Sequence, residues 1–345
     1  MWEVLPVFKK RYKLKTIIIA EAGVNHNGSM ELAKKLVDAA VAANVDYVKF
    51  QTFKADKLVS KTAQMADYQV ENTGKKTSQL EMLKNLELTF DNFSELKKYC
   101  DSKNIRFLST GFDDESIDFL ITLKMDFFKV PSGEITNLPY LERIAKTKTP
   151  VIISSGMANL EEVTDAFKLF KSCGYENKDI ILLHCNTEYP TPLSDVNLRV
   201  LELFRDTFGV EVGYSDHTAG TFIPIVAASC GARIIEKHFT LDKNLPGPDH
   251  KASLDPDELK QMVQDIRNVE LVLGKKEKMP TESEKKNLVP ARKSIVANCR
   301  INKGEMLNLE NLTTRRPGSG ISPMKIYDVI GTEASRDFEE GELIQ

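Results

Sequence analysis

The sequence predicts an α/β protein: a (β/α)₈ barrel followed by a small β-rich domain. From Thr16 onward, short apolar strands that end in polar residues alternate with amphipathic helical segments, which is typical of a parallel sheet. This unit recurs eight times over roughly 230 residues, close to the ~250 residues usual for such a barrel. After it, a charged stretch with prolines leads into short β-like runs separated by Gly-containing turns. A doubly wound open sheet is the alternative, but it usually has fewer strands, and no GxGxxG follows the first strand.

Each expected strand is a short apolar or β-prone run that ends in polar residues. The eight strands are expected at 16–23, 46–53, 105–112, 127–134, 150–157, 179–186, 211–218 and 232–240. The segments between them include 31–44 and 159–174, where apolar residues recur at helical spacing. The order of elements therefore predicts parallel strands with a helix after each strand.

Two regions interrupt this rhythm. Residues 54–79 form a polar insertion after the second strand that is longer than an ordinary βα loop, so it is either a lid or substrate wall or a disordered excursion. Residues 276–290 are expected to form a linker between a barrel domain at 1–275 and a second domain at 291–345. Within the barrel domain, residues 1–15 are expected to form an N-terminal cap.

The composition excludes several classes of partner. The 47 basic and 50 acidic residues give a net charge of -3, so nothing suggests binding to nucleic acid or to an anionic membrane. No apolar run reaches the ~18 residues of a membrane span. The five cysteines are scattered without a CxxC pair, which favours a reducing cytoplasm and argues against a cysteine zinc site. We expect a cytoplasmic location.

Two histidines end neighbouring strands of the predicted barrel. His217 and His238 each follow an apolar, β-prone run, at 212–214 and 234–235, where a buried strand would end, and side chains at the carboxyl ends of parallel strands meet at the barrel mouth. One such histidine would be explained as a satisfied polar group at the edge of the core. Two of them, beside Asp216, Glu236 and Asp249, instead predict an active site in which neutral imidazoles share a divalent metal.

The other strand ends supply polar groups to the same mouth. Lys49 and Lys129 lie inside otherwise apolar patterns, where an unpaired ammonium group would be costly, so they predict an anionic ligand. Glu21 on the first strand is the best candidate for a general acid or base. Tyr189, in the YPTP loop, either covers a sugar or organic acid or belongs to a plain turn. The remaining strand-end residues are Gln51, Thr110, Ser132, Glu134, Ser155, His184, Thr187, Ser215 and Glu236.

Several long motifs in order resemble those of bacterial sialic acid synthases. The motifs are IIIAEAGVNHNGS, VKFQTFKADKLVSKTAQMADYQ, KVPSGEITNLPYL, LLHCNTEYPTP, GYSDHT, EKHFTLDKNLPGPDHKAS and RRPGSGISP. The resemblance extends over essentially the whole chain, and its C-terminal portion is similar to the antifreeze-like (SAF) domain of that family. The family includes N-acetylneuraminate, legionaminate and pseudaminate synthases.

The resemblance implies a barrel that condenses phosphoenolpyruvate with an open-chain N-acylated mannosamine-type sugar and releases phosphate. It implies that His217 and His238 hold a divalent metal, usually Mn²⁺ with Mg²⁺ or Co²⁺ as alternatives, that Glu21 lies near the reacting carbons, and that Gln51 lies close to the metal. Positions implied for phosphoenolpyruvate are Lys49, Thr110, Lys129, Ser132, Ser155 and Ser215, with Thr187 where some relatives place an asparagine on the phosphate. Positions implied for the sugar are Glu134, Tyr189 and Asp249. Arg316 matches an arginine that the second domain donates to the partner subunit, which implies a domain-swapped homodimer.

The motifs leave the product open. Gly111 stands where the family usually has proline, which is expected to loosen the loop that carries Thr110, and HCNTEYP is as typical of legionaminate-type members as of others. The first expectation is N-acetylneuraminate from N-acetylmannosamine, and the alternative is legionaminate from 2,4-diacetamido-2,4,6-trideoxymannose. More distant alternatives are a metal-dependent pyruvate aldolase and a non-catalytic sugar-binding protein.

Overall fold

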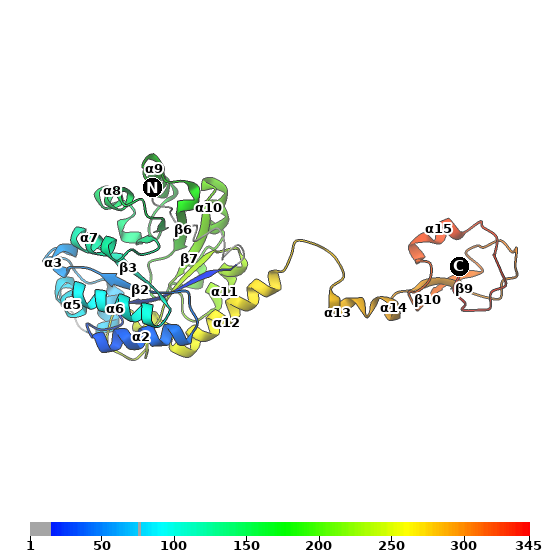
Figure 1. Ribbon diagram of the computed structural model, residues 1–345, viewed down its shortest axis with the longest axis horizontal. Helices are drawn as coiled ribbons and strands as arrows, with labels where there is room; N and C mark the ends of the chain where they lie inside the picture. Colours follow the sequence, from blue (N-terminus) through cyan, green and yellow to red (C-terminus); the bar gives the residue numbers. More distant parts are fainter. Residues whose placement is uncertain (1–14, 75–76) are drawn as a thin grey trace. The chain divides into compact units, whose positions relative to one another are not determined.

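A computed structural model describes residues 15–74 and 77–345. The predicted N-terminal cap at residues 1–15 lies outside these residues except for Lys15. Contacts within the chain divide it into two units, Met1–Gly274 and Lys275–Gln345, which are described separately below (Figure 1).

Eight parallel strands form the sheet of the first unit. They are β1 (Ile17–Gly23), β2 (Tyr47–Thr52), β3 (Arg106–Gly111), β4 (Phe128–Val130), β5 (Val151–Ser154), β6 (Ile180–Cys185), β7 (Glu211–Asp216) and β8 (Ile234–His238). Their hydrogen-bonded order is β3-β2-β1-β8-β7-β6-β5-β4, and the two end strands, β3 and β4, contact each other. The sheet therefore curls into a barrel, which confirms the predicted fold class and contradicts the open-sheet alternative.

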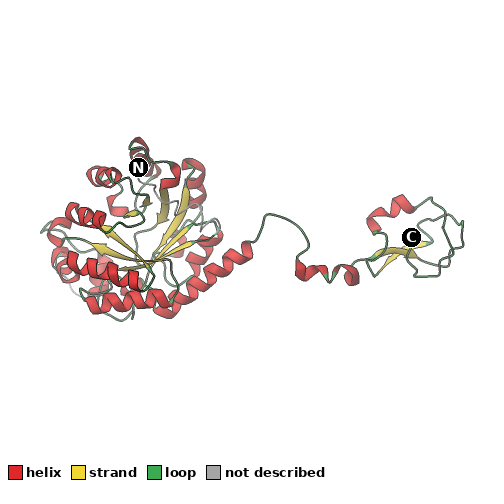
Figure 2. Ribbon diagram, viewed as in Figure 1, coloured by secondary structure: helices red, strands yellow, loops and turns green. Residues whose placement is uncertain are grey.

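Helices follow the strands and surround the barrel (Figure 2). They are α2 (Met30–Ala42), α6 (Phe90–Ser102), α7 (Asp114–Thr122), α8 (Leu138–Lys146), α9 (Leu160–Ser172), α10 (Val200–Phe208), α11 (Phe222–Ser229) and α12 (Pro256–Leu273). Short 3₁₀ turns are η1 (Ser132–Glu134), η2 (Asn177–Asp179), η3 (Leu193–Asp195) and η4 (His250–Ala252). Polar caps fix several helix starts: Asn159 accepts the backbone N–H groups of Glu161 and Glu162 at the start of α9. Among the described helices, none combines the length and apolar character that crossing a membrane requires.

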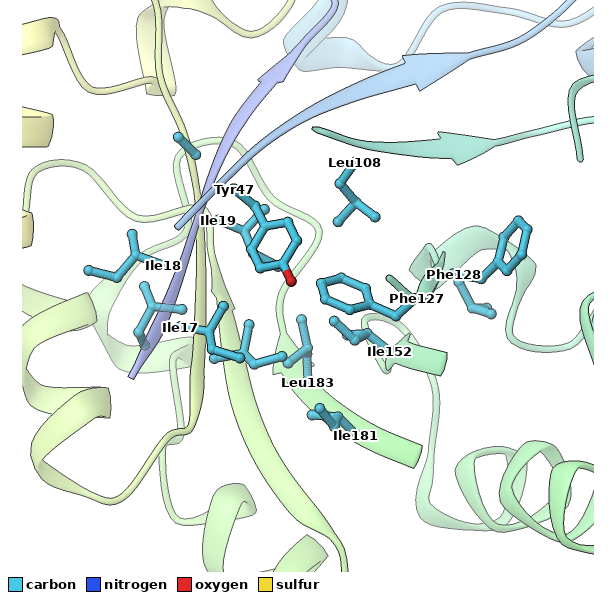
Figure 3. Close-up of a cluster of buried hydrophobic side chains, with 14 of the residues drawn as sticks. Ile17, Ile18, Ile19, Tyr47, Leu108, Phe127, Phe128, Ile152, Ile181 and Leu183 are labelled. Carbon is cyan, nitrogen blue, oxygen red and sulfur yellow. The ribbon is translucent and has the colours of Figure 1, made fainter. Parts of the chain in front are cut away.

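The core of the barrel lies directly beneath its polar mouth. Figure 3 shows Tyr47, Phe127 and Ile152 pointing toward one another, with the rings of Tyr47 and Phe127 4.9 Å apart. In a strand, the residue two positions further on points to the same side. The inward apolar residues Ile19, Tyr47, Leu108, Phe127 and Ile152 are thus followed by Glu21, Lys49, Thr110, Lys129 and Ser154. This alternation is what places polar side chains over an apolar floor.

The insertion after β2 is folded over most of its length. It contains α3 (Ala55–Leu58) and α4 (Asp67–Thr73), and α5 (Gln79–Leu86) continues the folded segment past the predicted end at residue 79. Apolar side chains of this longer segment, including Met65, Met82 and Leu86, pack with Val24 and Phe53 in a cluster separate from the main core. The described part of the insertion is therefore a structured wall.

The second unit has a small core of its own. It contains α13 (Glu282–Lys285), α14 (Leu288–Ala291), β9 (Ser294–Ala297), β10 (Leu312–Arg315), η5 (Pro323–Lys325) and α15 (Ile326–Val329). Strands β9 and β10 are antiparallel, and isolated bridges such as Ile301 to Phe338 extend the β structure. Ile295, Leu307, Phe338 and Ile344 are buried together. The expectation of a small β-rich domain after the barrel is confirmed.

Candidate active site

A cavity of about 300 Å³ opens at the carboxyl ends of the barrel strands. Twelve of the residues predicted for the site line it: Glu21, Lys49, Gln51, Thr110, Lys129, Ser132, Thr187, Tyr189, Ser215, His217, His238 and Asp249. They come from strands and loops that are far apart in the sequence. The barrel is what brings them together, as the strand-end argument anticipates.

Three predicted residues do not line this cavity. Ser155 donates its hydroxyl to the Leu183 carbonyl at 3.0 Å, because β5 places the preceding Ser154 on the inner face instead. Glu134 accepts a hydrogen bond from Asn137 Nδ2 at 2.6 Å. Arg316 belongs to the second unit, where its Nε donates to the Ala291 carbonyl at 3.0 Å. The ligand roles implied for these three residues stay predictions.

The ring nitrogens of the two histidines differ in their hydrogen bonding. The Nδ1–H of His217 donates to the carbonyl of Asn186, so its Nε2 carries the lone pair, and the Tyr189 hydroxyl donates to that atom at 3.1 Å. The Nδ1 of His238 is buried without a hydrogen-bond partner among the described residues. It lies 3.8 Å from Asp249 Oδ2. The two imidazole centroids are 5.5 Å apart.

Both imidazoles suit a metal ion. Burial lowers the pKa of His217 to about 4 and that of His238 well below its ordinary value, so both are neutral near neutral pH. Neutral imidazole is the form that binds metals, and the buried nitrogen of His238 without a partner fits the same role. No group of three or more His, Cys, Asp or Glu side chains in the described chain is arranged to hold a metal. A cation would therefore complete its coordination with water or substrate.

A buried cluster of two lysines and two glutamates forms the floor of the cavity. Lys49 Nζ lies 2.8 Å from Glu21 Oε2 and 3.6 Å from Glu236 Oε1. Lys129 Nζ lies 3.8 Å from Glu236 and donates to Ser154 Oγ at 2.6 Å. All four charged side chains are at most 6% exposed. The two ammonium groups are therefore held in place before any ligand enters.

The surroundings of Glu21 and Glu236 shift the pKa values of their carboxyl groups in opposite directions. Burial, opposed by Lys49, raises the pKa of Glu21 to about 7. Burial would also raise the pKa of Glu236, but Lys129 and Lys49 outweigh it and hold that pKa below its usual value. Glu236 is thus a permanent anion, whereas Glu21 can take up and release a proton near neutral pH. With Glu21 protonated, the cluster has a surplus of positive charge for an anionic ligand.

Glycines allow the close packing of this site. Gly23 has a φ of +52°, and a Cβ there would lie 3.2 Å from Glu21 Oε1 and 3.3 Å from Gln51 Nε2. A Cβ on Gly156 would lie 2.7 Å from Ser132 Oγ, which accepts the Gly156 N–H at 3.0 Å. Any larger residue at these two positions would displace the groups that line the cavity.

Gly111, the departure from the family pattern, ends β3. The Tyr140 hydroxyl donates to its carbonyl at 2.7 Å. A Cβ at this position would lie 3.2 Å from the Ile117 side chain and backbone nitrogen. The backbone next to Thr110 is thus fixed by a hydrogen bond from α8 and packs against α7.

Sequence reasoning missed part of the lining. It does not name Ser154, it places Glu236 in the mouth only as an acidic strand-end residue beside the histidines, and it does not foresee the apolar part of the wall, formed by Val24, Met82, Leu83, Leu86 and Phe112. Alternation along β5 from the core residue Ile152 would have identified Ser154. The i, i+4 spacing of Met82 and Leu86 is a signal for one buried helix face, but it does not reveal that this face borders the cavity.

Comparisons with known proteins identify the family of the chain. The NeuB family matches residues 36–278, and the SAF domain matches residues 292–345. The chain is 49% identical to the N,N'-diacetyllegionaminic acid synthase of Campylobacter jejuni, over 96% of this chain and 99% of that protein. It is also 49% identical to the enzyme of the same name from Legionella pneumophila, over 94% of this chain and 92% of that protein.

A solved structure extends the comparison to three dimensions. The N-acetylneuraminic acid (sialic acid) synthetase of Leptospira borgpetersenii, crystallised with citrate, is 33% identical with a TM-score of 0.69. The match covers 79% of this chain and 90% of that one. The resemblance inferred from the motifs is confirmed: this chain belongs to the NeuB family and carries a SAF domain after its barrel.

Proposed function

We propose that this protein is a nonulosonic acid synthase that condenses phosphoenolpyruvate with an open-chain N-acylated mannosamine-type sugar. Of the two products considered, N,N'-diacetyllegionaminic acid has the better support, because both relatives at 49% identity are named for it. The Leptospira protein named for N-acetylneuraminic acid is 33% identical. The sugar substrate would then be 2,4-diacetamido-2,4,6-trideoxymannose.

The observation that carries this proposal is the meeting of two buried lysines and two neutral histidines in one cavity. Lys49 and Lys129 would bind the carboxylate and phosphate oxygens of phosphoenolpyruvate, because ammonium groups form their strongest hydrogen bonds with anions. Hydroxyl groups of Thr110, Ser132 and Ser154 line the same cavity and can donate to the remaining oxygens. Glu236 offsets one of the two positive charges when the cavity is empty of ligand.

His217 and His238 would hold a divalent cation, with Mn²⁺ as the first candidate and Mg²⁺ or Co²⁺ as alternatives. When bound, the cation supplies Lewis-acid polarisation of the sugar carbonyl and orients a water molecule. The Asn186 carbonyl accepts the Nδ1–H of His217 and so fixes the tautomer whose Nε2 can bind the cation. Gln51 donates to Glu21 at 3.0 Å and so keeps that carboxyl group beside the histidines.

Glu21 is proposed to move the proton. The methylene carbon of phosphoenolpyruvate bonds to the aldehyde carbon of the sugar, and the aldehyde oxygen takes up a proton. Water adds to the carbon that bears the phosphate oxygen, and cleavage of that carbon–oxygen bond releases phosphate. A carboxyl group with a pKa of about 7 can donate the first proton and accept one from the water. Tyr189 and Asp249 are proposed to contact the sugar.

The remaining parts of the proposal concern the whole protein. Arg316 is proposed to complete the active site of a partner subunit in a domain-swapped homodimer. It is exposed in the second unit, and a guanidinium group can bind an amide or hydroxyl oxygen with two hydrogen bonds. The same proposal includes a barrel domain at 1–275, a linker at 276–290 and a second domain at 291–345. It also includes a cytoplasmic location.

The test is phosphate release from phosphoenolpyruvate with Mn²⁺, measured for 2,4-diacetamido-2,4,6-trideoxymannose and for N-acetylmannosamine. The proposal predicts a higher kcat/KM for the former. Faster turnover of N-acetylmannosamine would make the protein an N-acetylneuraminate synthase. Phosphate release with neither sugar by the folded, metal-supplied protein would contradict the synthase assignment, and consumption of pyruvate without phosphate release would indicate an aldolase.

A further inference from the structure

A completely buried ion pair lies next to both histidines of the proposed metal site. Lys237 Nζ is 2.5 Å from Asp216 Oδ2, and both side chains are 0% exposed. The two residues are direct partners in the pairing of β7 with β8. Because side chains alternate along a strand, Asp216 and Lys237 point away from the cavity, whereas His217 and His238 line it. The pair therefore forms a link behind the histidines.

The single ammonium group of Lys237 holds both flanks of His217. It donates to the carboxylate of Asp216 and to the carbonyl of Thr218. The Asp216 carboxylate in turn accepts the backbone N–H and the hydroxyl of Thr218, each at 3.1 Å. The residue before His217 and the residue after it are thus bound to one another and to Lys237. These hydrogen bonds restrain the backbone on both sides of His217 relative to β8.

The same lysine directly precedes His238 in the chain. On its other edge, β8 pairs with β1, so that Lys237 lies opposite Ala20 and His238 lies opposite Glu21. The backbone N–H of Phe239 donates to the Glu21 carbonyl at 3.0 Å. His238 is therefore fixed from the side of β1, and Lys237 connects this fixed segment to the turn that carries His217.

We propose that Lys237 and Asp216 are positioning residues that set the spacing and orientation of His217 and His238 for a shared divalent cation. This inference rests on the two-histidine metal site of the proposed function. Burying two charges is costly, and apolar residues of similar volume usually stabilise a core at least as well, so stability alone does not account for the pair. A site with two protein ligands depends strongly on the distance between them, because no third side chain corrects an error in their placement.

A second ion pair in the same barrel offers a matched control. Arg267 of α12 lies 2.7 Å from Asp46 Oδ2, with side chains 18% and 9% exposed. Asp46 also accepts the backbone N–H of Ile18 at 3.0 Å. This pair joins a helix to the amino-terminal ends of β1 and β2, at the end of the barrel opposite the cavity. Its loss would remove stabilising contacts without touching the histidines.

The experiment measures the Kd of the full-length protein for Mn²⁺ without substrate, from the electron paramagnetic resonance signal of free Mn²⁺, together with the Tm of each variant. Lys237→Met and the double variant D216N/K237M are expected to weaken Mn²⁺ binding about 10- to 100-fold, the usual effect of losing a group that orients metal ligands. D46N/R267M is expected to lower the Tm with less than about a twofold change in Kd.

Folded Lys237 variants with a wild-type Kd would overturn the inference, and so would equal weakening by D46N/R267M. If Lys237→Met does not fold, Asp216→Asn provides the test, because it keeps the shape of the side chain and can still accept from Thr218. Absence of Mn²⁺ binding to the wild-type protein is a different result. It would overturn the two-histidine metal site itself, and with it this inference, whereas phosphate release would still test the synthase reaction.

Discussion

At the scale of single residues, the hydroxyl of Tyr189 occupies the position that a metal would take on His217. It donates to Nε2 at 3.1 Å, and the two rings stack with centroids 4.1 Å apart. Metal binding must break this hydrogen bond. The tyrosine therefore has two roles in the proposal, as a competitor for the imidazole lone pair before the metal binds and as a contact for the sugar afterwards.

Tyr189→Phe is predicted to bind Mn²⁺ about 2- to 10-fold more tightly, because a typical hydrogen bond of net value about 0.5–1.5 kcal/mol no longer has to be broken. The ring stack is preserved in this variant. Calorimetric titration with Mn²⁺ in the absence of substrate measures the effect. Weaker binding by Tyr189→Phe would instead show that the hydroxyl supports the metal site.

Glu21 makes the stability of the protein depend on pH. Burial raises its pKa from 4.5 to about 7, so the folded protein keeps a proton that the unfolded chain releases. This stabilising contribution is fully present below the unfolded pKa and is lost as the pH rises through about 7. Relative to Glu21→Gln, the wild type is predicted to lose on the order of 3 kcal/mol of unfolding free energy across this range, since one pKa unit corresponds to about 1.4 kcal/mol.

Urea unfolding of wild type and Glu21→Gln at a series of pH values measures this difference, and its slope with pH is the readout. Glu142→Gln, on the exposed surface of α8, is the control and should follow the wild type. A pH-independent difference between wild type and Glu21→Gln would contradict the raised pKa. In addition, Glu21→Gln should lower kcat about 100-fold or more if Glu21 transfers a proton.

At the scale of elements, α5 gives the cavity an apolar wall, whereas the floor of the cavity is charged. Met82, Leu83 and Leu86 lie on this helix and face a site whose other walls are rich in charged and hydroxyl groups. An apolar wall favours a sugar carbon without a hydroxyl group, and discrimination of this kind is worth about 10- to 200-fold in kcat/KM. The deoxygenated carbon of 2,4-diacetamido-2,4,6-trideoxymannose fits that preference.

Met82→Gln is predicted to reduce the preference for the 6-deoxy sugar over N-acetylmannosamine about 10-fold, because a polar group replaces part of the apolar wall. Met157→Gln makes the same chemical change at another lining residue, which is 73% exposed, and should leave the preference unchanged. The ratio of the two kcat/KM values, measured by phosphate release, is the readout. Equal ratios in the two variants would exclude α5 from sugar discrimination.

The elements also show what could be predicted from sequence. The strands and their polar ends can be predicted from the sequence because period-two alternation places every second residue on one side. Lys49 and Lys129 can therefore be assigned to the mouth. Ser154 and Ser155 are exchanged in the prediction because both residues are small and polar, and choosing between them requires knowing that Ile152, two residues before Ser154, points into the barrel core. The helices of the insertion escape prediction because part of the apolar surface that they pack against, Val24, follows β1 and lies far from them in the sequence.

At the scale of the whole molecule, the chain consists of two units with separate cores. The role proposed for Arg316 requires the second unit of one subunit to serve the barrel of another, so neither unit alone can test it. Complementation between inactive variants tests this arrangement directly, since only exchange between subunits combines an intact barrel with an intact arginine.

Glu21→Gln and Arg316→Ala are each predicted to be inactive, and mixing them after dissociation and reassembly should restore about one quarter of the wild-type sites. Half of the reassembled dimers would contain one subunit of each kind, and half of the sites in those dimers would be intact. Phosphate release before and after mixing measures the recovery. An inactive mixture, with mixed dimers demonstrated by differently tagged subunits, would mean that Arg316 acts within its own chain.

The pair of imidazoles has a consequence for how the protein obtains its cation. Among the described side chains, no third ligand joins His217 and His238. Two imidazoles without a chelating carboxylate or thiolate release a divalent ion readily, so the ion would exchange with the surrounding solution many times in the life of one protein molecule. Output of the sugar acid would then follow the free concentration of transition metal in the cell. Starvation for that metal would then slow the proposed reaction before any change in the amount of enzyme.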